Sequence, residues 1–225
     1  MENRKSTYTI IFIVITACLI MGYVDAIISP PYMIKSLIKL SLFLALPLLF
    51  CLRDKSISFK NLFKANKKSI SRALILGICV YGIILGAYFI LGPFFDMSMI
   101  TTSLENNIGV NKSNFVFVAI YISFVNSLLE EFFFRGFAFL SLKEVSNRKL
   151  SYIFSSLAFS LYHIAIMTNW FGLTLYMILI VSLFVGGLIF DWLNEKYNNI
   201  YSSWLVHMCA NFAINTVGFI LFGIL

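Results

Sequence analysis

Charged residues are scarce in this chain of 225 residues, because Asp, Glu, Lys and Arg together make up only 12% of it. A soluble domain carries about 25% charged residues, and half that share cannot cover the surface of a water-soluble globule. Hydrophobic residues account for 60% of the chain, including 24 phenylalanines. This composition excludes a soluble enzyme, a disordered chain and a secreted disulfide scaffold, and it predicts a polytopic membrane protein.

Cysteine, proline and histidine are also infrequent. The four cysteines form no CxxC or Cys/His ligand spacing, so we interpret them as small buried hydrophobes rather than metal ligands. The four prolines all lie in the first half of the chain. A transporter with repeated halves would show broken segments at matched positions, and this distribution disfavours that class.

Seven apolar segments run over 7–28, 34–52, 72–95, 113–141, 150–168, 171–192 and 200–225. Each is near the ~20 residues needed to span hydrocarbon. We predict an all-α, polytopic membrane helical bundle of about seven transmembrane helices, with one multi-pass domain over 1–225. An undetected short or re-entrant segment would bring the count to eight. Gly82 and Gly86 have GxxxG spacing, which we interpret as internal helix packing rather than a dimer contact.

The basic residues predict the orientation. The formal net charge is +7, but the basic residues cluster between apolar segments, which indicates topology rather than nucleic-acid binding. Seven of them lie between Arg53 and Arg72, including Lys55 and Lys60, and further groups follow the fourth and sixth segments. Lys35 and Lys112 fall on the opposite side, with Lys39 assigned there as the marginal case. We therefore predict a cytoplasmic N-terminus and a C-terminus on the other side.

Polar groups occur inside three of the predicted spans, where they are energetically costly and point to function. Both histidines of the chain are among them. These residues are Glu130, Glu131 and Arg135 in the fourth segment, His163 in the fifth, and His207 and Asn211 in the seventh.

Helix geometry suggests how these groups are used. Glu131 and Arg135 are four residues apart, with the acid first, which favours an intrahelical ion pair. Glu130 points about 100° away and lacks this partner, so it is free to face another helix. A desolvated carboxylate without a full counter-charge has a raised proton affinity, which suits a general base. His207 and Asn211 share one helix face and could contact a water, an oxyanion or a metal.

Each of these groups also has a structural interpretation. Glu131 and Arg135 could be a purely structural pair, and His207 with Asn211 could simply hydrogen-bond between helices. Asp25 and Asp191 lie near predicted span ends, and we interpret them as structural. Asn126 precedes Glu130 by one helical turn, in a position to orient it. If the fifth span starts near residue 150, His163 lies roughly 20 Å along it. Glu130 and His207 would then lie closer to the cytoplasmic edge than His163.

A carboxylate base, imidazoles and an amide donor are the parts needed to activate water and stabilise a tetrahedral oxyanion. They predict hydrolysis of an amide within or beside the bilayer. Other protease designs are missing, because the sequence has no HExxH, no GxGD pair and no GxSxG motif. Cys209 is near His207 in sequence, but neighbouring helix positions point apart, which argues against a Cys nucleophile.

These motifs resemble those of the CPBP family, the CaaX-protease and bacteriocin-processing proteins also called the Abi family. The resemblance rests on EExxxR (Glu130, Glu131, Arg135), FxxxH (Phe159, His163) and HxxxN (His207, Asn211). It covers about 113–215 and implies that this stretch is the catalytic core of an all-helical intramembrane endopeptidase whose cavity opens to the cytoplasm.

The resemblance also implies roles for these residues. Glu130 would activate water with help from His163, while His207 and Asn211 would hold the oxyanion or the water. Glu131 and Arg135 would form a supporting ion pair. The family has been described both as metalloproteases and as glutamate proteases, and Glu130, His163 and His207 could supply three zinc ligands. We favour the glutamate mechanism without a cofactor, because Asn is a poor zinc ligand but a good oxyanion donor.

Three functions remain open from the sequence. The first is a plasma-membrane endopeptidase acting on a membrane-associated peptide or protein, with a role in peptide or bacteriocin processing or in self-immunity. The second is a non-catalytic membrane immunity or scaffold protein, and the third, disfavoured above, is a proton-coupled transporter. The Lys/Asn/Ile/Phe bias indicates a bacterial source, which makes prenylated substrates improbable. We expect no nucleic-acid partner, and the oligomeric state is left open.

Overall fold

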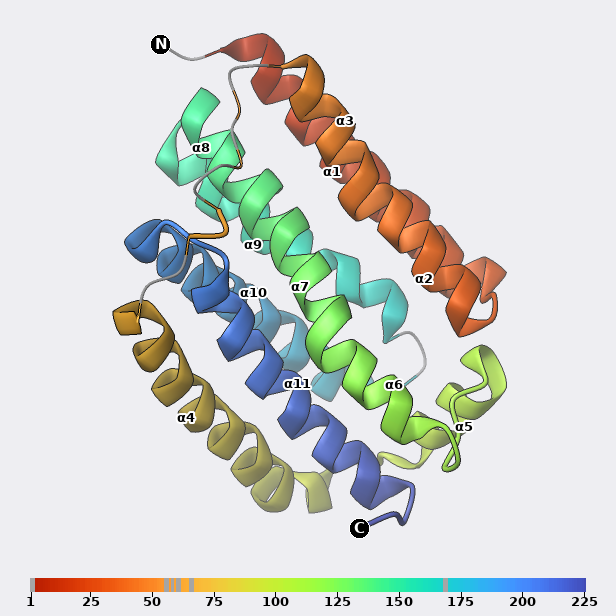
Figure 1. Ribbon diagram of the computed structural model, residues 1–225. Coiled ribbons are helices and arrows are strands. Elements are labelled where there is room, and N and C mark those ends of the chain that lie inside the picture. Colours follow the sequence, from red (N-terminus) through yellow and green to blue (C-terminus); the bar gives the residue numbers. More distant parts are fainter. Residues whose placement is uncertain (1–2, 55–56, 58, 60–61, 65–66, 168–169) are drawn as a thin grey trace.

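A computed structural model of the chain describes residues 3–54, 57, 59, 62–64, 67–167 and 170–225. None of these residues belongs to a β-strand, so the part of the chain described is all-helical (Figure 1). Lys55 and Lys60 of the predicted basic loop lie outside these ranges. The first half contains α1 (Arg4–Tyr23), η1 (Val24–Ile28), α2 (Tyr32–Leu40), η2 (Ser41–Ala45), α3 (Leu46–Arg53), α4 (Lys67–Leu91), η3 (Gly92–Phe94) and α5 (Ser98–Ile108). The second half contains α6 (Phe115–Tyr121), η4 (Ile122–Asn126), α7 (Ser127–Glu130), η5 (Glu131–Ser141), α8 (Leu142–Val145), α9 (Arg148–Ile166), α10 (Leu173–Tyr197) and α11 (Tyr201–Leu221).

Several of these elements follow one another without a break and form longer helices. Within the described residues, six helices are long and apolar enough to cross a membrane: Arg4–Ile28, Tyr32–Arg53, Lys67–Phe94, Phe115–Val145, Leu173–Tyr197 and Tyr201–Leu221. They correspond to six of the predicted segments. The interspersed η1, η2, η4 and η5 are π-helical stretches, in which the backbone hydrogen bonds reach one residue further than in an α-helix.

The remaining predicted segment, 150–168, forms α9, a helix of 19 residues. It is less apolar than the other six because Arg148 and Lys149 open it and because its buried face carries four serines, Ser151, Ser155, Ser156 and Ser160. These serines face protein rather than lipid. The prediction of an all-α membrane bundle with about seven long helices is therefore confirmed.

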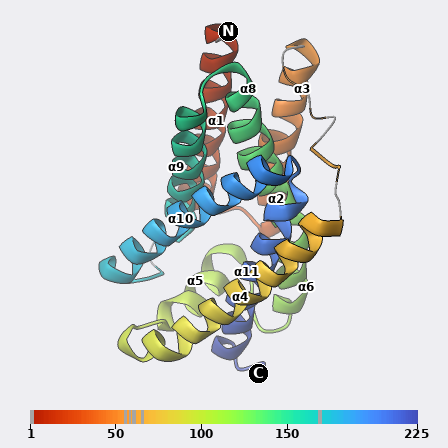
Figure 2. The same cartoon turned by 90° about the vertical axis from the view of Figure 1, so that its left-hand side faces the viewer.

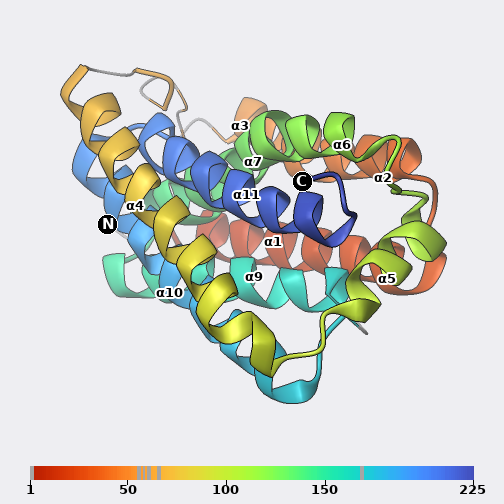
Figure 3. The ribbon, with the colours of Figure 1, turned by 90° about the horizontal axis from the view of Figure 1, so that it is seen from below.

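The two termini lie at opposite ends of the bundle (Figures 1 and 2). In Figure 2, α1 and α9 run nearly parallel, whereas α4 and α10 cross the bundle obliquely. The view in Figure 3 shows α4 on the outside, running along α11, which is its main packing partner. The long helix Phe115–Val145 is buried from Leu129 to Phe139, and this places its polar residues among neighbouring helices.

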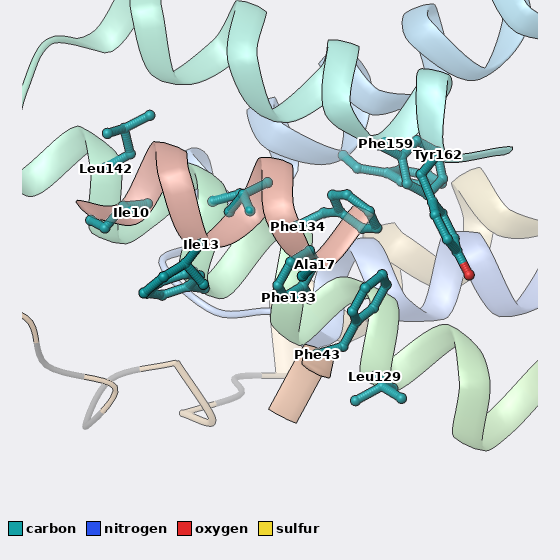
Figure 4. Close-up of a cluster of buried hydrophobic side chains, with 14 of the residues drawn as sticks. Ile10, Ile13, Ala17, Phe43, Leu129, Phe133, Phe134, Leu142, Phe159 and Tyr162 are labelled. Atoms are coloured by element: carbon teal, nitrogen blue, oxygen red, sulfur yellow. The ribbon is translucent and has the colours of Figure 1, made fainter. Parts of the chain in front are cut away.

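The largest buried apolar cluster surrounds this central helix (Figure 4). Phe43 of η2 stacks on Phe133 of η5 with ring centroids 4.0 Å apart, and it meets the rings of Phe134 and Tyr162 edge-on. The Tyr162 hydroxyl points away from α9 (Figure 4). The first-half helices thus pack directly on the segment that carries the EExxxR motif.

Close helix contacts are made by different glycines from those that the GxxxG spacing indicated. A Cβ added at Gly82 or Gly86 would meet no described atom within 4 Å, so the interpretation of these two as internal packing residues is wrong. Gly77 of α4 instead lies against Cys209 of α11, and Gly187 of α10 lies against Ser156 of α9. Close packing depends on which side of the helix a glycine faces, and the spacing alone does not give that.

Candidate active site

The candidate site begins with two neighbouring carboxylates inside the central helix. Glu130 is the last residue of α7 and Glu131 the first of η5. Glu130 is 2% exposed and Glu131 is fully buried. A π-helical stretch widens the turn and changes which side chains align along the helix, and such stretches are frequent at functional sites. Both acids therefore point into the bundle rather than toward lipid.

Three of the predicted site residues meet at Glu130. Its Oε2 atom lies 3.6 Å from Nε2 of His207 on α11 and 4.0 Å from Nε2 of His163 on α9. These distances are longer than direct hydrogen bonds, and both imidazoles approach the same carboxylate oxygen. Histidines from two other helices thus converge on one carboxylate oxygen of the central helix.

The other ring nitrogen of each histidine has its own acceptor. Nδ1 of His207 lies 2.9 Å from Oε1 of Glu131, and Nδ1 of His163 lies 2.7 Å from the Phe159 carbonyl oxygen. In each ring, a hydrogen on Nδ1 can be donated to the acceptor named here. This tautomer leaves the lone pair of each Nε2 facing Glu130. The arrangement fixes both rings with their basic nitrogens toward the same point.

His163 and Glu130 lie at matching positions along their helices. α9 begins at Arg148 and the central helix ends at Val145, so each residue is 15 positions from that end of the molecule. The expectation that Glu130 lies nearer the edge is wrong, because the central helix continues beyond the predicted boundary at 141. His163 is consequently about 22 Å along α9, at 1.5 Å per residue of α-helix.

The two asparagines near the site differ in what they contact. Asn126 donates to Oε1 of Glu130 over 3.0 Å, which confirms the prediction that it orients this side chain. Asn211 lies one turn beyond His207, and its amide donates to the Ile122 carbonyl over 3.3 Å. In the described structure Asn211 therefore holds α11 against η4 rather than contacting Glu130.

The predicted ion pair is present and is part of a larger buried group. Nε of Arg135 lies 3.6 Å from Oε2 of Glu131 and 3.7 Å from Oδ1 of Asp191 on α10. The guanidinium carbon is 4.1 Å from the centre of the Phe159 ring. Because Glu131 contacts both Arg135 and His207, the pair also holds a site histidine in place.

Asp191 was interpreted from the sequence as a structural residue near a span end. It lies instead in the middle of the buried polar group, with no exposed surface. Its two carboxylate oxygens accept hydrogen bonds of 3.0 Å from Ser155 and Ser156. The helix α10 continues to Tyr197, which leaves Asp191 well inside the bundle. Asp25 is likewise buried at its side chain and pairs with Lys35.

Lys39 is the most important residue that the sequence reasoning placed wrongly. It was assigned, as the marginal case, to the basic residues on the side opposite the cytoplasm, but it lies in α2 with 6% exposure, and its Nζ is 2.5 Å from Oε1 of Glu130. Nζ also donates to the Asn126 side-chain oxygen over 2.6 Å. The expectation that Glu130 lacks a counter-charge is therefore wrong. A lysine inside an apolar segment is the signal that could have indicated this role.

The fit of a zinc ion can be judged from these donor atoms. Glu130, His163 and His207 supply suitable atom types, and both imidazoles have the second partner typical of zinc-bound histidines. However, no three His, Cys, Asp or Glu side chains in the described part of the chain are grouped closely enough to hold a metal ion. The ammonium of Lys39 also occupies one Glu130 oxygen and would repel a dication. As arranged here, the residues do not fit the metal.

One comparison with known proteins bears on this site. Residues 112–213 match the family model described as "Type II CAAX prenyl endopeptidase Rce1-like". The matched segment contains all three motifs and every predicted site residue, while Lys39 lies outside it. No curated protein and no solved structure matches the chain.

Proposed function

Because residues 112–213 match the family model of Rce1-like type II CaaX prenyl endopeptidases, we propose that this protein is an intramembrane endopeptidase with Glu130 as its general base. The observation that carries the proposal is the convergence of His163 Nε2 and His207 Nε2 on Oε2 of Glu130, at 4.0 and 3.6 Å. A water held between these atoms can donate to the carboxylate while an imidazole fixes its orientation.

The proposed reaction is direct attack by this water on the scissile carbonyl carbon. The water transfers one proton to Oε2 of Glu130, its oxygen bonds to the carbon, and the carbonyl electrons move to the oxygen to form an oxyanion. When the intermediate collapses, the C–N bond breaks and the proton passes from Glu130 to the leaving nitrogen. Glu130 returns to its ionised form, so the cycle needs no further reactant.

The surrounding groups support this chemistry by holding the imidazoles in position. Glu131 accepts the Nδ1 proton of His207 and stabilises positive charge that develops on that ring. Asn211 is proposed as an oxyanion donor, as the family resemblance implies. For this role its amide would exchange the 3.3 Å contact with the Ile122 carbonyl for one with the substrate.

We assign the reaction to a metal-independent mechanism, because Lys39 holds one oxygen of Glu130 and the donor atoms do not group as a metal site. A zinc-dependent mechanism predicts loss of cleavage on treatment with 1,10-phenanthroline and its recovery on addition of Zn²⁺. Our proposal predicts an unchanged rate in both conditions.

The substrate class that fits best is a peptide or protein held at the membrane, and we propose a role in peptide or bacteriocin processing or in self-immunity. We also propose a bacterial plasma-membrane location, a cytoplasmic N-terminus and a site that opens to the cytoplasm. The positive-inside rule supports this orientation. Lys143 and Arg148 both pair with Glu195, the neighbour of Lys196, and the Val145 carbonyl of α8 accepts a hydrogen bond from Asn3 near the N-terminus.

The test uses purified full-length protein in liposomes. Two fluorogenic probes are offered, a farnesylated CaaX peptide and an amphipathic unprenylated peptide. Wild-type protein is expected to cleave at least one, and Glu130→Gln to lose about 10²–10⁴-fold in rate, the usual contribution of a general base. Glu144→Gln is the matched control, because Glu144 is an exposed acid on the same continuous helix and should leave cleavage unchanged. Equal rates in wild type and Glu130→Gln would refute the mechanism.

A further inference from the structure

Lys39 lies outside the matched family segment and has no role in the mechanism above, yet it makes the shortest contact with the proposed base. The side chain is 7% exposed, and that of Glu130 is 3% exposed. An ammonium group buried among apolar helices is strongly unfavourable unless it is paired and hydrogen-bonded. A location this costly calls for a reason beyond orientation in the membrane.

Lys39 and Asn126 together engage one oxygen of Glu130. Nζ lies 2.5 Å from Oε1, and the amide of Asn126 donates to the same oxygen over 3.0 Å. Asn126 in turn accepts from Nζ over 2.6 Å, so the three groups form a closed triangle. Within the described residues Oε1 is thus fully engaged, and Oε2 is the oxygen left facing the two histidines.

The ammonium is itself held in a defined place. It lies 5.4 Å from the ring centre of Phe43 and 5.1 Å from that of Tyr162, and both rings belong to the main buried cluster. Aromatic faces at this range attract a desolvated cation. Because Phe43 stacks on Phe133 of the central helix, the position of Lys39 is tied to the helix that carries Glu130.

We propose that Lys39 is a positioning residue that prepares Glu130 for catalysis, an inference that rests on the function proposed above. Its ammonium clamps Oε1, turns Oε2 toward Nε2 of both histidines and keeps the carboxylate ionised, as a base must be. When Glu130 takes the proton from water, the charge of Lys39 is no longer balanced by its partner. That charge then favours the negative charge that develops on the oxygen of the attacked carbonyl.

Lys39→Gln tests the charge, because glutamine can still donate to Glu130 and Asn126 but carries no charge. We expect kcat to fall roughly 10- to 100-fold with KM nearly unchanged, since Lys39 does not touch the substrate. Lys39→Arg restores the positive charge and should recover part of kcat. Lys35→Gln is the matched control, because Lys35 is one turn away on the same helix but pairs with Asp25, and its kcat should match wild type.

A measurement of unfolding keeps the inference testable should Lys39→Gln prove unstable. Lys39→Gln is expected to lower the unfolding temperature when Glu130 is present but to have little effect in the Glu130→Gln background, where no carboxylate is left unpaired.

The inference is overturned if kcat of Lys39→Gln equals wild type, if Lys39→Gln and Lys39→Arg are equally impaired, or if the two substitutions show no coupling. The proposed function fails in a different way, when the wild-type protein cleaves neither probe or when Glu130→Gln cleaves at the wild-type rate. In that case the positioning role of Lys39 falls with it.

Discussion

Replacing Arg135 with methionine is expected to be the most damaging single change to the fold at this site. Arg135 is fully buried and lies between two carboxylates, with Nε 3.6 Å from Glu131 and 3.7 Å from Asp191. Methionine fills much of the same space but carries no charge. The substitution therefore leaves two neighbouring buried carboxylates facing each other without the cation that separates them.

The size of the effect follows from these contacts. Breaking a buried ion pair by removing one partner costs about 3–5 kcal/mol. The guanidinium also lies 4.1 Å from the Phe159 ring centre, and a desolvated cation over an aromatic ring contributes up to about 2 kcal/mol. We expect Arg135→Met to lower the free energy of unfolding by about 3–7 kcal/mol, the sum of these two ranges. Because Glu131 holds Nδ1 of His207, cleavage should be lost as well.

The assay is unfolding in mixed micelles followed by tryptophan fluorescence, for which Trp192, next to Asp191, is a local reporter. Arg148→Met is the matched control, since Arg148 bonds Glu195 through Nε and a second nitrogen but its side chain is 67% exposed. Solvent-exposed pairs contribute little to stability, so this variant should unfold close to wild type.

A second-site change distinguishes lost charge balance from lost packing. Adding Asp191→Asn to Arg135→Met removes one of the two unpaired carboxylates and should recover part of the stability, a non-additive result typical of contacting charges. The reasoning is refuted if Arg135→Met is no less stable than Arg148→Met, or if Asp191→Asn lowers the stability of Arg135→Met further.

Two further predictions concern helix packing and orientation. Gly187→Ala should lower stability by about 1–3 kcal/mol, because the added Cβ would lie 3.0 Å from Cα of Ser156. The added Cβ of Gly186→Ala meets no described atom within 4 Å, so this control variant should keep the stability of wild type. Equal unfolding of the two variants would contradict the close contact between α9 and α10. In a cysteine-free background, Lys112→Cys should react with a membrane-impermeant maleimide on intact cells and Lys149→Cys only after lysis, and the opposite pattern would overturn the orientation.

Much of the fold was predictable because long apolar runs have few alternatives to helix in a membrane. The boundaries were less predictable. The central helix continues to Val145 rather than ending at 141, because Lys143 and Glu144 are good helix formers and a charge does not end a helix. Asn147, whose side chain accepts from the Leu150 backbone N–H, caps the next helix. A hydropathy pattern places the boundary near 141, where polar residues begin. The helix itself ends at Val145, shortly before the Asn147 cap of the next helix.

The site was predictable where its residues share a helix and not where they meet across the bundle. Glu131 and Arg135, or Asn126 and Glu130, are four residues apart, and helical periodicity brings each pair together. Lys39 and Glu130 are 91 positions apart, and no spacing rule connects them. Asp191 seemed to lie at a span end for a similar reason, because hydropathy alone does not show that Ser155 and Ser156 of another helix satisfy its carboxylate.

The placement of Lys39 and Asp191 also changes how the proposed base is understood. Counted in their ionised forms, three carboxylates in the described site (Glu130, Glu131 and Asp191) face two fixed cations (Lys39 and Arg135). The carboxylates of this buried group thus outnumber its fixed cations by one. A proton taken from water balances this excess, so the transfer reduces the charge buried in a medium of low dielectric constant. The tendency to accept that proton therefore belongs to the whole buried group, and Glu130 is the carboxylate whose free oxygen faces the place where the water would be held.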